Sequence, residues 1–402
     1  MASVSNATAT HGASLARVLS SRVQLLLHKS YFSKSTLSPA GLACKQLHVN
    51  LTISVIKGRP FTSISHRRPG LASASLGQAG PVANFASEIA QKLGSQKEMD
   101  PVVSPEWLYS RLSDPNIKVI DASWYMPGDN RNPFQEYKAC HIPKALFFDV
   151  DGVVDPTSNL PHMLPTEDAF AAAVSALGIK NTDTLIIYDG KGIFSAARVW
   201  WMFRTFGHQN VFVLDGGLPH WRAAGLSIED KTPEDLVAKI CEASEVVKKV
   251  YQGQQVGGTS FKAKLQPDFV WSLDQVKANI EDAKRVLVDA RSKARFDGLA
   301  PEPRKGIRGG HVPGSKCVPF NEVLKDGAML LEKEELRSKF DKAGVSLISP
   351  IVASCGTGVT ACVLALALHR LGKNDVAVYD GSWTEWGGLP DTPIQTSSEK
   401  SN

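Results

Sequence analysis

The chain has 402 residues, enough for two or three domains, and its 6 cysteines lack the paired spacing of a disulfide framework or a zinc ribbon. Its net charge of +5 is unevenly distributed, because residues 1–87 hold nine Lys and Arg and no acidic residue. Subtracting these nine from 45 leaves 36 basic against 40 acidic residues, a net charge of −4 for the rest. This balance gives no indication of nucleic-acid binding.

Residues 1–87 have the composition of an organelle transit peptide, since they are rich in Ser, Ala and Thr and contain basic but no acidic side chains. Ser14–Lys29 can form an amphipathic helix that carries leucines as well as basic residues. This pattern favours the mitochondrial matrix over the plastid. We predict a transit peptide and disordered leader over residues 1–98, with a cytosolic location if the leader is absent. A merely disordered tail is the other interpretation. The apolar run Leu25–Leu27 is too short to span a bilayer.

After the leader, strands and helices alternate along the first half of the chain. The sequence Ser104-Pro105 is typical of a helix start, with serine as the N-cap and proline at the first helical position. Further helices are predicted over Glu167–Leu177 and Ser195–Phe206, and strands over Ile117–Ser123, Leu146–Val150, Leu185–Tyr188 and Val211–Leu214.

The second half repeats the first in outline. Asp121, His141, Asp215 and Trp221 are followed, in the same order and at nearly one spacing along the chain, by Asp289, His311, Asp380 and Trp386. Four ordered matches at nearly one spacing indicate an internal duplication of one α/β domain. We predict two tandem domains, each a mainly parallel sheet with helices on both faces and its site at the carboxyl ends of the strands. The expected boundaries are residues 99–235, a linker over 236–266, and 267–395.

The segment Ser354–Thr360, S-C-G-T-G-V-T, follows a short apolar run and precedes a helical pattern over Ala361–Leu371. Cys355 would therefore face backbone N–H groups at a helix start, an environment that favours the nucleophilic thiolate. Gly356 and Gly358 would let the loop curl tightly. The alternative is that Cys355 is a small buried core residue. In the first copy Asp189 stands at the matching position and cannot accept sulfur, so we expect that copy to be catalytically silent.

The chain resembles the two-domain rhodanese superfamily over nearly all residues after the leader. The resemblance rests on D-A-S-W at Asp121, H-I-P at His141, W-W-M-F-R at Trp200, D-A-R at Asp289, G-H-V-P-G at Gly310, the Cys355 loop and Y-D-G-S-W at Tyr379. It implies two rhodanese-like domains and transfer of a sulfane sulfur, which the cysteine accepts as a persulfide and passes to a thiophilic acceptor.

Two features are similar to the mercaptopyruvate branch, and the match is nearest to its plant mitochondrial members. They are the uncharged C-G-T-G-V-T loop and E-P-R at Glu302. The resemblance implies that Arg295 and Arg304 hold a substrate carboxylate, as guanidinium forks do well. It further implies that the loop residues Gly356, Gly358, Val359 and Thr360 bind the substrate.

Two further residues receive catalytic roles from the resemblance, each with an alternative. Thr357 would bond to the substrate or pass a proton, or would only shape the loop. His141 would relay protons across the domain interface, or would be a packed histidine of the silent domain. Solvated charges remain the alternative for Arg295 and Arg304.

The predicted function is transfer of sulfur from 3-mercaptopyruvate, and less well from thiosulfate, through a Cys355 persulfide to cyanide, a thiol or thioredoxin. No metal or organic cofactor, nucleic acid or membrane partner is expected. A thiosulfate:cyanide sulfurtransferase and a non-catalytic persulfide-binding module are the alternatives. A cysteine phosphatase is excluded, because its C-x5-R loop needs an arginine where Ala361 stands.

Overall fold

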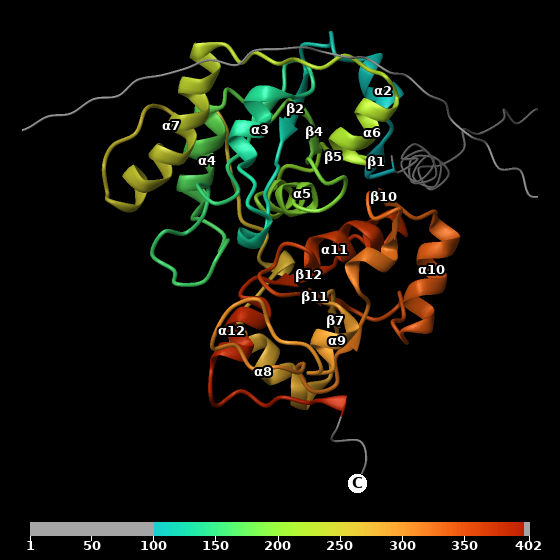
Figure 1. Cartoon of the computed structure of the whole chain (residues 1–402). Coiled ribbons are helices and arrows are strands. Elements are labelled where there is room, and N and C mark those ends of the chain that lie inside the picture. Colours follow the sequence, from blue (N-terminus) through green and yellow to red (C-terminus); the bar gives the residue numbers. More distant parts are fainter. Residues whose placement is uncertain (1–99, 398–402) are drawn as a thin grey trace, which may run out of the picture. The chain divides into compact units, whose positions relative to one another are not determined.

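The computed structural model describes residues 100–397 and contains two parallel sheets, one in each half (Figure 1). The first sheet has the strand order β1-β5-β4-β2-β3. All its neighbouring strands are parallel. Its strands are β1 (Val102–Val103), β2 (Ile117–Asp121), β3 (Leu146–Phe147), β4 (Thr184–Tyr188) and β5 (Val211–Leu214).

The second sheet repeats this order as β6-β12-β11-β7-β8, again with parallel neighbours. Its strands are β6 (Val270–Trp271), β7 (Val286–Asp289), β8 (Lys316–Cys317), β11 (Ile351–Ser354) and β12 (Ala377–Tyr379). A small antiparallel pair, β9 (Leu324–Lys325) and β10 (Met329–Leu330), is added to this half. The identical strand orders confirm the duplication predicted from the residue spacings.

Helices cover both faces of each sheet, as the burial of every residue of β5 and β11 requires. The first half contains α2 (Pro105–Tyr109), α3 (Pro133–Ala139), α4 (Glu167–Ala176), α5 (Ala196–Thr205), α6 (Gly217–Ala223), α7 (Glu234–Tyr251) and the 3-10 turn η1 (Pro127–Asp129). The second contains α8 (Leu273–Asp282), α9 (Lys293–Phe296), α10 (Lys333–Lys342), α11 (Ala361–Arg370), α12 (Ser382–Gly388) and the 3-10 turns η2 (Pro267–Phe269) and η3 (Phe320–Val323).

Local sequence signals explain several of these boundaries. Ser104 caps α2 as predicted, since its Oγ accepts from the Trp107 N–H at 3.2 Å. The strand predicted over Leu146–Val150 is shorter in the structure, because β3 ends at Phe147. The stretch predicted as a linker contains all but the first two residues of α7, an 18-residue helix that packs against α4 through buried residues such as Ile240 and Val247.

The two copies belong to one compact unit and meet through equivalent helices, α5 and α11, which follow β4 and β11 (Figure 1). Every residue of α5 is buried, and so are the first eight of α11. Helices that are buried on all sides are typical of a core. One hydrophobic cluster accordingly runs through both copies. This packing brings first-copy loops to the Cys355 loop at the start of α11.

No helix within residues 100–397 is long and apolar enough to cross a bilayer. The same residues contain no group of three or more His, Cys, Asp or Glu side chains arranged to hold a metal ion. The predicted transit peptide lies outside the described residues.

Candidate active site

A cavity of about 480 Å³ opens at the carboxyl ends of the second sheet, where the two copies meet. Its walls include residues that were singled out from the sequence, namely Arg295, Arg304, Cys355, Gly356, Thr357, Val359 and Thr360. The first copy contributes Trp124, Met126, Lys191 and Phe194. The candidate site is therefore completed by the copy that lacks the cysteine.

The Cys355 loop is held from α12, the helix that follows β12. The Cys355 N–H donates to Ser382 Oγ at 3.2 Å, and the Trp383 N–H donates to the Cys355 carbonyl at 2.9 Å. Thr384 donates from both its N–H and its Oγ1 to the Gly356 carbonyl, at 2.9 and 2.7 Å. Cys355 is 1% exposed. Within residues 100–397, the N–H groups of residues 357–360 donate no hydrogen bond.

The matching loop of the first copy shows how such a curled loop binds an anion. The Asp189 carboxylate accepts four backbone N–H bonds, from Lys191 and Gly192 on Oδ1 and from Phe194 and Ala196 on Oδ2, at 2.8–3.0 Å. Burial raises the pKa of Asp189, while these N–H groups act in the opposite direction.

The same donors can be located in the second copy. At the spacing that relates Asp189 to Cys355, they belong to residues 357, 358, 360 and 362. Cys362 already donates its N–H to the Val359 carbonyl at 3.2 Å, in the first turn of α11. The other three N–H groups have no acceptor within the described residues. The loop therefore keeps three backbone donors for an anion next to the sulfur.

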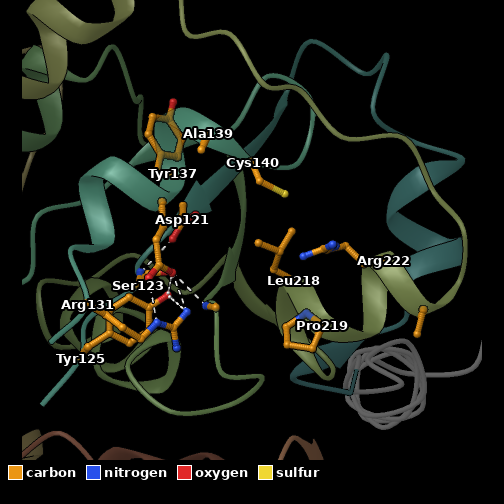
Figure 2. Close-up of a pocket in the computed structure, with 13 residues that line it drawn as sticks. Asp121, Ser123, Tyr125, Arg131, Tyr137, Ala139, Cys140, Leu218, Pro219 and Arg222 are labelled. Carbon is orange, nitrogen blue, oxygen red and sulfur yellow. Dashed lines mark hydrogen bonds and ion pairs between the residues drawn. The ribbon is translucent and has the colours of Figure 1, made fainter. Parts of the chain in front are cut away.

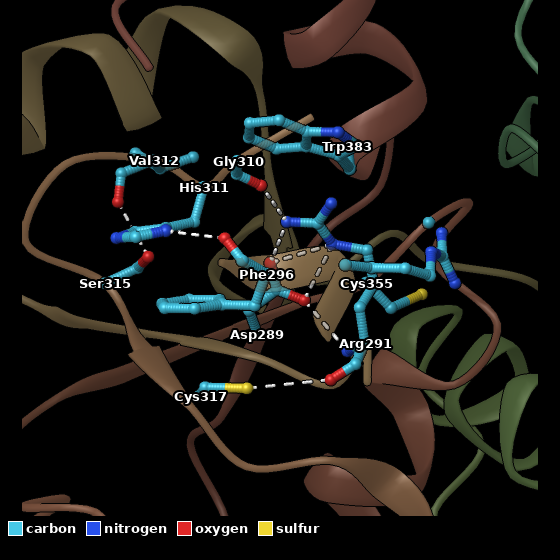
Figure 3. Close-up of polar contacts among 12 residues, drawn as sticks. Asp289, Arg291, Phe296, Gly310, His311, Val312, Ser315, Cys317, Cys355 and Trp383 are labelled. Atoms are coloured by element: carbon cyan, nitrogen blue, oxygen red, sulfur yellow. Dashed lines mark hydrogen bonds and ion pairs between the residues drawn. The ribbon is translucent and has the colours of Figure 1, made fainter. Parts of the chain in front are cut away.

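Arg295 reaches the loop from α9. Its Nη2 lies 3.3 Å from where a side chain on Gly356 would begin, so glycine leaves room for the guanidinium. Glu302 binds Arg295 through both carboxylate oxygens and also accepts from Arg291 Nη1 at 2.8 Å. Arg291 is in turn buried on Asp289 beneath the Cys355 loop (Figure 3). This carboxylate–guanidinium network fixes the direction of Arg295.

Arg304 is arranged differently. Within the described residues its guanidinium has no hydrogen-bond or ion-pair partner, although it is half-buried and lines the cavity. Burial lowers the pKa of Arg304, while the charges of Asp151 and Cys355 act to raise it and Arg295 to lower it. Arg304 is thus a cation next to the cysteine whose donors are available to an anionic ligand.

The structure does not bring His141 to this cavity. Its ring is fully buried in the first copy, with Nδ1 2.8 Å from the Tyr137 carbonyl and Nε2 3.4 Å from Glu229. These contacts match the alternative of a packed histidine. His311, its counterpart, is likewise bound to the Phe296 carbonyl at 2.7 Å and stacked on that ring (Figure 3).

A different histidine, His162, lies behind the cavity wall and was missed from the sequence; its ring contacts Trp124, which lines the cavity. His162 Nδ1 lies 3.0 Å from Asp151 Oδ1, and its ring packs edge-on against Trp124. Trp124 Nε1 donates to the other oxygen of Asp151 at 2.9 Å. Burial acts to raise the pKa of Asp151, but His162, Trp124 and Arg304 lower it overall. The only sequence feature at His162 is H-M-L-P, which follows a segment rich in Asp and Pro. This feature does not indicate a catalytic role.

Gly358, predicted to bind substrate, does not line the cavity and instead faces the domain interface. Its φ is +78°, and a side chain there would meet the Asp380 carbonyl at 2.9 Å and Arg198 Nη1 at 3.0 Å. Arg198, from α5 of the first copy, also forms an ion pair with Asp380. Glycine at 358 therefore allows the loop to approach this pair closely.

These features define a tandem α/β protein with a cysteine loop between its two domains. The chain belongs to the rhodanese family, because the model of the rhodanese-like domain matches residues 104–224 and 272–389. It is 60% identical over 302 residues to the mitochondrial thiosulfate/3-mercaptopyruvate sulfurtransferase 1 of Arabidopsis thaliana, covering 75% of this chain and 80% of that protein.

Other relatives carry related names. Human 3-mercaptopyruvate sulfurtransferase is 39% identical over 291 residues, covering 71% of this chain and 91% of the human protein. The crystal structure of SseA from Escherichia coli, described as a 3-mercaptopyruvate sulfotransferase of the rhodanese fold, superimposes with a TM-score of 0.60 at 37% identity. That superposition covers 71% of this chain and 99% of the bacterial one.

Proposed function

We propose that this protein is a sulfurtransferase that moves sulfur from 3-mercaptopyruvate, and less efficiently from thiosulfate, through a persulfide on Cys355. The relatives named for these two donors support the substrate class. The observation that carries the proposal is the pair of matching loops. Four N–H groups surround the Asp189 carboxylate, and three of their counterparts beside Cys355 donate no hydrogen bond within the described residues.

In the first step the Cys355 thiolate attacks the sulfur of 3-mercaptopyruvate. The new S–S bond forms as the C–S bond breaks, and the electron pair leaves with pyruvate enolate, which takes up a proton to become pyruvate. The persulfide anion then occupies the place that the carboxylate has in the Asp189 loop. N–H groups fixed in advance stabilise such a charge without reorganisation.

In the second step a thiophilic acceptor attacks the outer sulfur. The S–S bond breaks and returns the Cys355 thiolate, so the cycle needs no metal or organic cofactor. Cyanide, a small thiol and thioredoxin all fit this chemistry as acceptors. The residues that line the cavity come from both copies, and they do not select one of these acceptors over the others.

Arg304 and Arg295 are suited to hold the substrate carboxylate. Arg304 supplies unpaired donors, while Glu302 directs Arg295 towards Gly356. A 2-oxo acid needs this anchoring because its sulfur must be aligned with the thiolate for attack. Thiosulfate has no carboxylate, but the cations Arg304, Arg295 and Lys191 around the cavity suit a small dianion too.

The enolate requires a proton donor near the cavity. His162 contacts the cavity-lining Trp124 and is bound to Asp151, so it is a better candidate for this role than His141, which is packed in the first copy away from the cavity. The Asp151 carboxylate orients the His162 ring through Nδ1. Thr357 lies in the cavity wall, close to the attacking sulfur in sequence, and its hydroxyl can pass the proton on.

The test is to treat the enzyme with 3-mercaptopyruvate and to measure both pyruvate release and persulfide mass on Cys355. Cys355→Ser should abolish transfer and leave the fold intact. Cys241→Ser, at an exposed position of α7, is the matched control and should keep full activity. Turnover in Cys355→Ser would refute the proposal. Persulfide formation without turnover for any acceptor would favour the non-catalytic binding module.

The cellular location is part of the proposal. The relative of 60% identity is named mitochondrial, and residues 1–87 have transit-peptide composition. Residues 1–87 fused to a fluorescent protein should colocalise with a mitochondrial dye. Fluorescence in plastids alone or in the cytosol would show that the address is wrong.

A further inference from the structure

The first domain contains a second cavity, of about 620 Å³, which the sulfur-transfer mechanism does not use (Figure 2). It lies at the carboxyl ends of β2 and β4, between α3 and α6. Asp121 and Ser123 form its floor, and Tyr137, Cys140, Leu218 and Arg222 stand around it. This is the position in the first domain that corresponds to the region beneath the Cys355 loop in the second.

In the second domain that region is filled by a guanidinium group (Figure 3). Arg291 binds Asp289 through Nε and Nη2, at 2.7–3.1 Å, and donates from Nη2 to the Gly310 carbonyl at 2.8 Å. Its guanidinium lies 4.1 Å from the centre of the Trp383 ring. Arg291 and Trp383 are both buried. The guanidinium thus neutralises Asp289 and fills the space under the loop.

The first domain keeps the same strand order but lacks both of these side chains. Ser123 stands at the position of Arg291, two residues after the matching aspartate, and Leu218 at that of Trp383, three residues before the matching tryptophan. The backbone equivalence is close: the Ser123 N–H donates to Asp121 Oδ1 at 2.8 Å, and the Arg291 N–H donates to Asp289 Oδ1 at 2.9 Å. Two large side chains are replaced by smaller ones in an unchanged frame, which accounts for the cavity.

Asp121 is therefore a buried carboxyl without the cation that its counterpart has. It is 2% exposed, and burial raises its pKa to about 7 despite hydrogen bonds from Ser123 and Tyr188. A second acceptor is also available. Cys140 occupies the position of Gly310, and its carbonyl accepts no hydrogen bond within residues 100–397. Two of the three acceptors of the Arg291 guanidinium thus have counterparts here, and neither counterpart is bound by a guanidinium within the described residues.

The other charged groups of the cavity favour a negative charge at the outer end of a ligand. Arg131 is already paired with Glu136, at 2.8 and 2.5 Å, and lies 3.6 Å from the centre of the Tyr125 ring. Arg222 is exposed, and its guanidinium has no ion-pair partner among the described residues. The cavity therefore offers an acid on the floor and an unpaired base at the mouth.

We propose that the first-domain cavity binds a small guanidino carboxylate, with its guanidinium on Asp121 and the Cys140 carbonyl and its carboxylate towards Arg222. The ligand's guanidinium would take the place that Arg291 has in the second domain. A planar fork matches a carboxylate in a way that an ammonium does not. The two ligand charges would meet their opposites, and the methylene chain would lie along Leu218 and Tyr137.

The probe is 4-guanidinobutyrate, with binding measured by titration calorimetry on the full chain. 4-Aminobutyrate has the same charges without the fork and should bind on the order of ten- to a hundredfold more weakly. Asp121→Asn should weaken binding by a similar factor. Ser123→Arg supplies the guanidinium from the chain itself and should abolish binding. Ser123→Ala, which removes the hydroxyl and adds no cation, is its control and should keep binding.

Alkylation of the cysteines by iodoacetamide locates the bound probe. Cys140 lines this cavity, whereas Cys241 lies outside it and Cys355 reports on the cavity between the domains. Saturating probe should slow the modification of Cys140 alone. Protection of Cys355 instead would place the probe at Arg304 and overturn the proposal. Equal affinity for the two probes, or unchanged affinity in Asp121→Asn, would overturn it as well.

Discussion

Arg198 of the first domain and Asp380 of the second form a buried ion pair, with 2.7 Å between Nη1 and Oδ1 and side-chain exposures of 1% and 4%. Asp380 Oδ2 also accepts from the Leu164 N–H at 2.9 Å, and Arg198 donates to the His162 carbonyl and, at 3.4 Å, to that of Gly358. The pair thus connects the Cys355 loop with the first-domain loop that presents His162. One ion pair therefore contacts both halves of the candidate site.

We expect Arg198→Met to lower the free energy of unfolding by about 3–5 kcal/mol, because it leaves the Asp380 carboxylate buried without a cation. Arg198→Met combined with Asp380→Leu should cost less than Arg198→Met alone. The measurement is urea denaturation. Lys339→Ala breaks an exposed pair with Glu322 and should change stability by less than about 1 kcal/mol. A double variant less stable than Arg198→Met would show that the unpaired carboxylate is not the source of the loss.

The fold could be predicted because the duplication is visible in residue spacing. Strand cores such as Leu185–Tyr188 and Ile351–Ala353 are continuous apolar runs, which is the pattern of strands buried on both faces. Helix α7 was taken for part of a linker because it belongs to no repeated motif. Its buried residues Ile240, Ala243 and Val247 do follow a helical period, and their partner α4 is visible only in three dimensions.

The candidate site could be predicted on the second domain and only poorly on the first. Cys355, Arg295 and Arg304 belong to local motifs, and the structure brings them into one cavity. His162 and Arg198 reach that region through the packing of α5 on α11, which has no local signal in the sequence. His141 received its catalytic role from the family resemblance, with a packed histidine as the alternative. In the structure both His141 and its repeat His311 have a ring nitrogen bound to a backbone carbonyl.

The two histidines can be separated by experiment. His162→Gln should lower kcat for 3-mercaptopyruvate by roughly 10²- to 10⁴-fold and change its pH profile, because a proton donor to the enolate is lost. His141→Gln should mainly reduce stability, by about 1–3 kcal/mol, since it disturbs a buried hydrogen bond to Tyr137. The measurements are the pH profile of kcat and the midpoint of urea denaturation, each compared between His162→Gln, His141→Gln and the wild type. A large loss of kcat in a stable His141→Gln protein would restore the role predicted from the sequence.

The unfilled environment of Asp121 predicts a pH dependence of stability. Its pKa rises from 3.8 to about 7 on folding, so the folded protein binds the proton more tightly than the unfolded chain. The free energy of unfolding should therefore decrease as pH rises from about 4 to 7, by on the order of 4 kcal/mol from this group. Ser123, Tyr188, Tyr137, Asp189 and Cys140 are the polar and titratable groups around it.

Asp121→Asn isolates this contribution. Stability is measured against pH for the wild type and the variant, and the difference between the two curves should change over that window. Asp114→Asn, at an exposed site before β2, is the control and should leave the curve parallel to that of the wild type. A constant difference between wild type and Asp121→Asn would show that the carboxyl is already ionised at low pH.

Donor choice should depend on Arg304. Removing one arm of a charge-assisted carboxylate clamp costs about 2–4 kcal/mol, or roughly thirty- to a thousandfold in kcat/KM. We expect Arg304→Ala to lose this much with 3-mercaptopyruvate and much less with thiosulfate, which has no carboxylate to orient. Arg304→Lys keeps the charge without the fork and should lie between. Arg295→Ala should also disturb Glu302, because that carboxylate would keep only Arg291 as a partner among the described residues.

The measurement is the ratio of kcat/KM for the two donors in wild type and Arg304→Ala. Lys305→Ala, the exposed neighbour outside the cavity wall, is the matched control and should leave the ratio unchanged. Arg304 has no ion-pair partner among the described residues, and Asp151, whose pKa the charge of Arg304 helps to lower, keeps its contacts with His162 and Trp124 when Arg304 is removed. A fall in the ratio therefore reports on the substrate carboxylate. An equal loss for both donors would mean that Arg304 supplies general positive charge, and a thiosulfate:cyanide sulfurtransferase would become the better assignment.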